Sequence, residues 1–193
     1  EEATSTRAVK VLNTVYKKYA SYASLAMDID ITIKDGNFSH KKTGKAFVKG
    51  NQYRLQTNEE DIVSNSETLW VYLKGSQSLQ ITNASTNDQN FFCYPAMLLQ
   101  KYQKYCVVEF LKNNATEYVV QFSAHNNDCP YQKIIVHINK SNYNINKIEA
   151  LETEDIGYTI KINNFRKNAN LKNDTFIFNE KEVKPSKVRD FRK

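Results

Sequence analysis

The sequence lacks the segments by which a chain crosses a membrane or enters an export pathway. No stretch approaches the roughly 20 uninterrupted apolar residues that a transmembrane helix needs. Its first residues, Glu1 to Thr4, carry neither the basic start nor the apolar core of a signal peptide. We therefore expect either a cytosolic protein or a mature secreted protein, and these residues leave both alternatives open.

Catalytic and cofactor motifs are also missing. There is no G-x-S-x-G elbow, H-E-x-x-H pair, phosphate-binding P-loop or glycine-rich dinucleotide turn. His40, His125 and His137 are far apart and share no ligand spacing, so we expect no metal site. The acidic clusters at 59–61 and 152–155 fall at expected turns, where they are interpreted as solvated charge. The sequence therefore predicts a protein that is not an enzyme and holds no cofactor.

Cysteine is scarce. The three residues, Cys93, Cys106 and Cys129, are too few for a disulfide scaffold and lack the paired C-x-x-C of a zinc site. Two interpretations stay open. All three are buried structural thiols, or one disulfide joins Cys106 to Cys129 and leaves Cys93 free.

The charge is moderately positive, with 27 basic against 21 acidic side chains and a net charge of +6. No nucleic-acid fingerprint accompanies it, so we expect no nucleic-acid partner. The basic residues are scattered except in the C-terminal tail, which holds Lys181, Lys184, Lys187, Arg189, Arg192 and Lys193. This tail is interpreted as a solvated surface, with contact to an acidic receptor or lipid headgroups as the alternative.

The periodicity of apolar residues predicts one helix followed by many strands. From Thr6 to Tyr22, apolar residues recur at steps of three and four and share one helical face: Val9, Leu12, Val15, Tyr16 and Tyr19. Strict alternation then begins at Met27, Ile29 and Ile31. Short polar connections separate eleven expected strands, at 27–33, 41–49, 53–55, 62–63, 69–73, 79–82, 106–111, 117–123, 133–138, 144–151 and 156–165.

Such short connections favour antiparallel pairing, because a parallel crossover needs many more residues. One short helix, expected at Pro95 to Tyr102, interrupts the strands. The strand Leu69 to Leu73 is apolar on both faces. No linker or repeat divides the chain, so we expect a single domain over residues 1–193.

Five segments resemble the LolA family of periplasmic lipoprotein carriers, in the order in which that family has them. Asp61 to Tyr72 is similar to the I-V-S-D-G-K-T-L-W-x-Y hairpin, and Pro95 to Leu99 to the P-x-M-L-[IL] lid helix. Gly44 to Lys49 resembles the second strand, Thr175 to Phe178 the F-x-F segment, and Val188 to Arg192 the terminal V-x-D-x-R.

The resemblance implies a mainly β fold with a few helices. We expect an open, incomplete antiparallel β-barrel of about eleven strands, covered on its concave side by the N-terminal helix and the short inserted lid helix. An apolar cavity between lid and sheet would hold acyl chains. Residues predicted to line the cavity and the lid are Leu12, Val15, Tyr19, Met27, Ile29, Ile31, Val48, Tyr53, Leu55, Leu69, Val71, Phe92, Met97 and Leu98.

The family has an arginine after its second strand that holds the lid shut, and Gly50 stands at that position here. Arg54, four residues later, is the candidate for lid control.

The function implied by the resemblance is carriage of acylated lipoproteins from the inner to the outer membrane. The expected protein is a periplasmic monomer that meets an inner-membrane releasing complex and an outer-membrane acceptor. The alternatives are a lipid- or lipoprotein-sensing regulatory module with the same fold, and an outer-membrane acceptor of the LolB type. A lipidated cysteine would mark the acceptor, and Glu1 stands at the first position here.

Overall fold

The computed structural model describes residues 2–84, 103–125, 129 and 131–192. The expected lid helix, with Phe92, Met97 and Leu98, lies outside the described residues, and so does Cys93. The chain divides into two compact units. Unit 1 comprises residues 1–21, 30–41 and 95–163, and unit 2 comprises residues 22–29, 42–94 and 164–193. The single domain over residues 1–193 stays a prediction.

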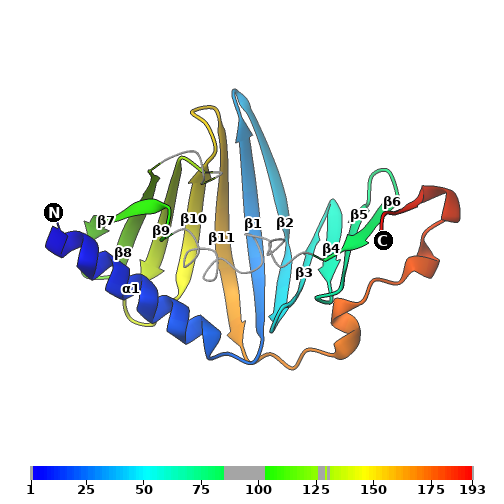
Figure 1. The fold of residues 1–193 in the computed structure, drawn as a ribbon, viewed down its shortest axis with the longest axis horizontal. Helices are drawn as coiled ribbons and strands as arrows, with labels where there is room; N and C mark the ends of the chain where they lie inside the picture. Colours follow the sequence, from blue (N-terminus) through cyan, green and yellow to red (C-terminus); the bar gives the residue numbers. More distant parts are fainter. Residues whose placement is uncertain (1, 85–102, 126–128, 130, 193) are drawn as a thin grey trace. The chain divides into compact units, whose positions relative to one another are not determined.

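Within the described residues, one α-helix and a twelve-stranded sheet form the fold (Figure 1). All eleven expected strands are present. The elements are α1 (Glu2–Ala20), β1 (Leu25–Asp35), β2 (Phe38–Lys49), β3 (Gln52–Thr57), β4 (Glu60–Ser64), β5 (Thr68–Leu73), β6 (Ser78–Asn83), β7 (Cys106–Asn113), β8 (Glu117–Ala124), β9 (Lys133–Asn139), β10 (Ile145–Leu151), β11 (Ile156–Lys167) and β12 (Val188–Asp190). The count of about eleven missed β12, because three residues are too few to establish an alternating pattern.

The strand order is β12-β6-β5-β4-β3-β2-β1-β11-β10-β9-β8-β7, so the sheet is not closed. Neighbouring strands are mostly consecutive in sequence and antiparallel, as their short connections predicted. Two pairs of neighbours are not consecutive: β1 lies beside β11, and β12 pairs parallel to β6. An open, mainly β fold of the expected class is confirmed.

Two glycines make the tight turns that begin the meander. Gly36, between β1 and β2, has φ +56°, and Gly50, between β2 and β3, has φ +58°. Only glycine adopts this left-handed conformation without a steric cost, which explains its use in two-residue connections. Both turns lie at short polar connections between strands that the sequence predicted.

In unit 1, α1 lies across the strands at the β7 end of the sheet (Figure 1). The helix buries one stripe, which consists of Ala8, Val11, Leu12, Val15 and Tyr19. The strands supply a matching row of directly paired residues, Val120, Val136, Ile148 and Ile160, each no more than 1% exposed. The helix is therefore held by its apolar stripe, since a lone helix of this length is only marginally stable in water.

In unit 2, the segment after β11 packs back onto the strands β4 to β6. It contains three short 3-10 turns that the sequence did not predict, η1 (Asn173–Phe176), η2 (Glu180–Glu182) and η3 (Pro185–Lys187). A buried cluster anchors it: Val63, Trp70, Leu79, Ile81, Phe178 and Val183. The Trp70 indole nitrogen also donates a 2.8 Å hydrogen bond to the Glu180 carboxylate. We call residues 170–192 the C-terminal segment.

Candidate functional site

One face of strands β2 to β5 gathers aliphatic side chains. Directly opposed residues of antiparallel strands point to the same side of a sheet. Val48 is opposite Tyr53, Leu55 is opposite Ile62, and Ile62 is opposite Val71. The register therefore places seven residues on what we call the apolar face: Ala46, Val48, Tyr53, Leu55, Ile62, Leu69 and Val71.

The apolar face is partly accessible. Ala46, Val48, Tyr53 and Leu55 are at most 8% exposed. Ile62, Leu69 and Val71 are only half-buried, so they retain surface that another apolar molecule can cover. Five of the predicted cavity residues lie together here. Their contact with acyl chains stays a prediction.

Six further predicted cavity residues, all among the described residues, lie in the core of one unit or the other. Leu12, Val15, Tyr19 and Ile31 belong to unit 1, and Met27 and Ile29 to unit 2, and all six are at most 3% exposed. None of them lines either hollow described below.

Arg54 lies on the other face of β3, toward the C-terminal segment. Its guanidinium donates to both carboxylate oxygens of Asp61, at 2.9 and 2.5 Å, and to the backbone oxygen of Thr175 at 3.2 Å. Asp61 is 5% exposed, so the ion pair is largely withdrawn from water. Arg54 thus joins β3, β4 and the C-terminal segment, and its control of a lid stays a prediction.

Asp61 corrects one expectation from the sequence. The cluster 59–61 was interpreted as solvated charge at a turn, but Glu60 and Asp61 belong to β4. Glu60 pairs with Lys42 at 3.0 Å, and Asp61 is buried against Arg54. Strands β2 and β3 supply the opposite charges, which a local view of the sequence does not reveal. The second cluster, 152–155, lies at a turn as expected.

A hollow of about 670 Å³ opens between the strands of unit 2 and the C-terminal segment. Its walls are strongly charged, with Arg54, Asp61, Lys74, Asp174 and Glu182 among the lining residues. Charged walls disfavour an acyl chain, because apolar ligands prefer sites whose lining is mostly hydrophobic. This hollow is therefore a poor candidate for lipid binding.

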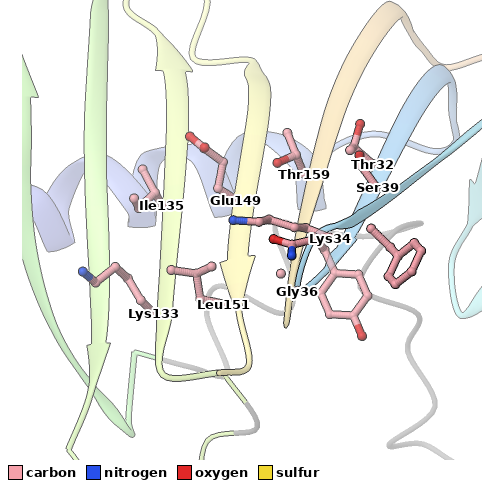
Figure 2. A pocket seen from close by; sticks show the side chains of 13 residues that line it. Thr32, Lys34, Gly36, Ser39, Lys133, Ile135, Glu149, Leu151 and Thr159 are labelled. Carbon is pink, nitrogen blue, oxygen red and sulfur yellow. The ribbon is translucent and has the colours of Figure 1, made fainter. Parts of the chain in front are cut away.

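A second hollow, of about 350 Å³, lies in unit 1 near the turn between β1 and β2 (Figure 2). Its apolar lining includes Ile135, Leu151 and Phe38, whose ring is 81% exposed. Lys34 and Lys133 add positive charge. The sequence analysis missed this hollow, although a glycine inside a strand, Gly157, is a recognised signal of close approach.

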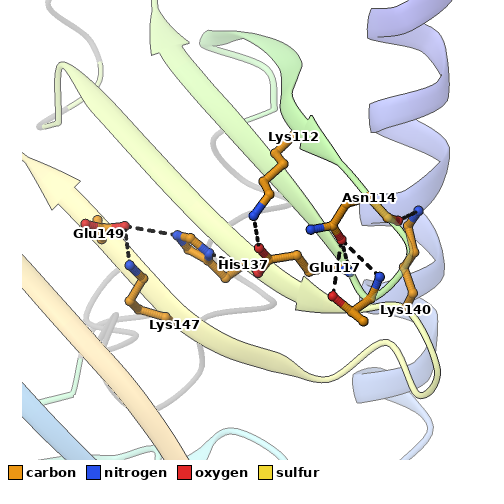
Figure 3. A network of polar contacts seen from close by, with 8 residues as sticks. Lys112, Asn114, Glu117, His137, Lys140, Lys147 and Glu149 are labelled. Carbon is orange, nitrogen blue, oxygen red and sulfur yellow. Dashed lines mark hydrogen bonds and ion pairs between the residues drawn. The ribbon is translucent and has the colours of Figure 1, made fainter.

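Glu149, which lines this hollow, belongs to a chain of ion pairs in unit 1 (Figure 3). His137 lies between two carboxylates, with its Nε2 3.0 Å from Glu149 and its Nδ1 3.5 Å from Glu117. Lys112 pairs with Glu117 at 2.9 Å, and Lys147 with Glu149 at 2.8 Å.

These partners lower the pKa of both carboxyl groups. Hydrogen bonding from Lys112 and then from His137 outweighs desolvation and lowers the pKa of Glu117. For Glu149, desolvation raises the pKa, but the bonds from Lys147 and His137 together outweigh it, so the pKa is lowered. In the part of the chain that the structure describes, no group of three or more His, Cys, Asp or Glu residues is placed to hold a metal ion.

The family described as outer membrane lipoprotein carrier protein LolA matches residues 30–179. The chain belongs to the LolA family. The match runs from β1 to the C-terminal segment and includes the apolar face and Arg54. Among curated proteins, none matches the sequence significantly.

Solved structures share the fold at low sequence identity. An uncharacterized conserved protein from Thermus thermophilus is 10% identical with a TM-score of 0.60, covering 97% of this chain and 99% of that one. A DUF1329 family protein from Desulfovibrio piger is 9% identical with a TM-score of 0.51, covering 94% and 99%. MucB is 10% identical with a TM-score of 0.50, covering 91% of this chain and 64% of MucB. At these identities the likeness concerns the fold alone.

Among the described residues, no helix has the length and hydropathy that are needed to span a membrane.

Proposed function

We propose that this protein binds the acyl chains of lipoproteins at the apolar face of β2 to β5 and carries lipoproteins through the periplasm. In this proposal it is a carrier and not an enzyme. It receives its cargo from a releasing complex at the inner membrane and delivers it to an acceptor at the outer membrane. Membership of the LolA family supports this class of function.

The observation that carries the proposal is the distribution of apolar residues in unit 2. Strand β5 is apolar on both sides, with Trp70 and Tyr72 facing the C-terminal segment and Leu69 and Val71 on the apolar face. Trp70 and Tyr72 pack with Phe178 and its neighbours in the buried cluster. Leu69 and Val71 remain half-buried, so an acyl chain could complete their burial.

The energetics favour such a use. Each methylene of an acyl chain that leaves water contributes about 0.8 kcal/mol, so a chain of ordinary length binds without any polar contact. Release then needs an acceptor that offers the chain a better apolar site. A carrier of this kind needs no catalytic group.

Binding of a synthetic triacylated lipopeptide to the purified protein tests the proposal. We expect saturable binding, with no binding of the same peptide without its acyl chains. Leu69→Asp and Val71→Asp should each weaken binding at least tenfold, because a carboxylate would be desolvated by the bound chain. Val71→Ser serves as a milder change if a charged variant does not fold.

Ile177→Asp is the matched control. Ile177 belongs to the C-terminal segment of the same unit and is 55% exposed, so a charge there should leave binding unchanged. Equal loss at Ile177 and Val71, or unaltered binding by folded Leu69→Asp and Val71→Asp variants, would contradict the proposed site.

The position of Arg54 favours a second candidate, a lipoprotein-sensing regulatory module. Arg54 is engaged by Asp61 and Thr175 on the face opposite to the apolar face, whereas carriers of the family use an arginine to close the lid. Depletion of the protein in its host separates the candidates. Lipoproteins that accumulate at the inner membrane indicate a carrier, and normal sorting with altered gene regulation indicates a sensor.

A further inference from the structure

Two buried thiols lie next to each other in unit 1. Cys106 is the first residue of β7, and Cys129 lies between β8 and β9. Their Sγ atoms are 4.0 Å apart, although the residues are 23 positions apart in the sequence. Both are buried, at 6% and 7% exposure. The thiols therefore come together through the fold and not through sequence proximity.

Backbone hydrogen bonds fix this approach. Cys106 is paired with Ala124, the last residue of β8. The His125 N–H donates to the Tyr105 carbonyl at 3.0 Å, and the Ala124 N–H donates to the Gln132 carbonyl at 3.0 Å. The chain on both sides of Cys129 is thus tied to the sheet that contains Cys106.

The environment of Cys106 makes its thiol unreactive in the folded protein. Burial raises the pKa of the Cys106 thiol to about 12, and the adjacent Cys129 thiol acts in the same direction. Since the thiolate is the nucleophile of sulfur chemistry, neither a catalytic nor a metal-binding role suits Cys106 at neutral pH. A structural bond between the two sulfurs is the chemistry that remains.

We propose that Cys106 and Cys129 form a structural disulfide when the protein folds in an oxidising compartment. A disulfide oxidant, such as oxidised glutathione or a dithiol oxidoreductase, supplies the oxidation. One cysteine, as its thiolate, attacks the oxidant and forms a mixed disulfide while a thiolate leaves. The second cysteine loses its proton, attacks the mixed disulfide and releases the other half of the oxidant as a thiol. Two protons and two electrons leave the protein.

The bond would connect β7, at one edge of the sheet, to the connection between β8 and β9. The sulfurs would move about 2 Å closer, to the bond length of a disulfide. Because the thiols are buried once the protein is folded, oxidation should be fast during folding and slow afterwards. The same burial should protect the finished disulfide from small reductants. This inference does not depend on lipid binding.

The test uses a Cys93→Ser variant, which removes the third cysteine and leaves one disulfide to form. It is refolded with oxidised glutathione or with a reductant, and free thiols and intact mass are measured under denaturing conditions. We expect no free thiols after oxidative refolding and the loss of two hydrogen atoms in mass. Protease digestion should yield one peptide pair that contains Cys106 and Cys129.

Stability provides the second measurement. The oxidised form of the Cys93→Ser variant should melt roughly 6 to 12 °C above its reduced form, since the cross-link restricts the unfolded chain. Both forms have the same sequence, so each controls for the other. Two free thiols after oxidative refolding would overturn the proposal. So would a wild-type disulfide that involves Cys93, or equal melting temperatures of the two forms.

Discussion

The Tyr19 hydroxyl accepts a hydrogen bond of 3.0 Å from the backbone N–H of Ile145, and both residues are 1% exposed. Ile145 begins β10 at an irregularity in its pairing with β9. Beside this bond, the ammonium of Lys18 donates to the side chain of Asn144, the residue before β10, at 3.2 Å. The last turn of α1 is thus attached to the start of β10 by directed bonds in addition to apolar packing.

Replacing Tyr19 with phenylalanine should therefore destabilise the protein. The change keeps the ring but leaves the buried Ile145 N–H without its partner, which costs about 1 to 3 kcal/mol. Urea unfolding followed by circular dichroism measures the difference. Tyr16→Phe is the control, because Tyr16 is half-buried on the same helix and should change stability by less than about 0.5 kcal/mol. A Tyr19→Phe variant as stable as the parent would show that water or another group accepts the hydrogen bond from the Ile145 N–H.

The ion pair of Arg54 with Asp61 predicts that the effects of substitutions at these two residues on the free energy of unfolding do not add. Arg54→Leu leaves the Asp61 carboxylate buried without its two charged hydrogen bonds, so we expect a loss of about 3 kcal/mol. Adding Asp61→Leu should recover much of that loss, because the unpaired charge is then gone. A double-mutant cycle from denaturant unfolding gives the coupling energy. Single effects that simply add would mean that the two side chains do not interact in solution.

Replacement by alanine should cost much more stability at Gly44 than at Gly157. A Cβ on Gly44 would meet the backbone of β3, with the Thr57 Cα only 2.8 Å away, and backbone in a paired strand cannot yield. We expect Gly44→Ala to cost about 1 to 3 kcal/mol. A Cβ on Gly157 would meet the end of the Leu151 side chain, also at 2.8 Å, and Leu151 is 37% exposed and can rotate away.

Gly157→Ala should consequently change the unfolding free energy by less than about 1 kcal/mol, helped by the lower entropy of the unfolded chain. The two variants are compared in the same denaturant titration. A larger loss at Gly157 than at Gly44 would contradict the strand spacing in this structure.

Most strands could be predicted from the sequence because their apolar residues alternate, and the unbroken apolar run from Leu69 to Leu73 indicated a strand that is apolar on both faces. Alternation is a local property, and every expected strand is present. The role of Asp61 could not be predicted, because its partner Arg54 lies on a neighbouring strand and the buried bond depends on the register between them. The hollow beside Leu151 is a similar case. It depends on several strands and a turn that come together only in the fold.

The lowered pKa values of Glu149 and Glu117 predict how the free energy of unfolding falls in acid. Their folded pKa values lie below the usual value near 4.5, through the bonds from Lys147, Lys112 and His137. A lowered pKa means that the unfolded chain binds protons more readily than the folded one. The stabilisation is therefore complete above the ordinary glutamate pKa and is lost as the pH falls through the lower folded pKa.

Glu149→Gln should reduce stability at pH 7 and flatten the acid limb of the curve of unfolding free energy against pH. Glu154→Gln, at an exposed turn, should leave that limb unchanged. If Glu149→Gln and the parent lose the same free energy between pH 7 and pH 3, the ion-pair chain around His137 does not stabilise the folded state.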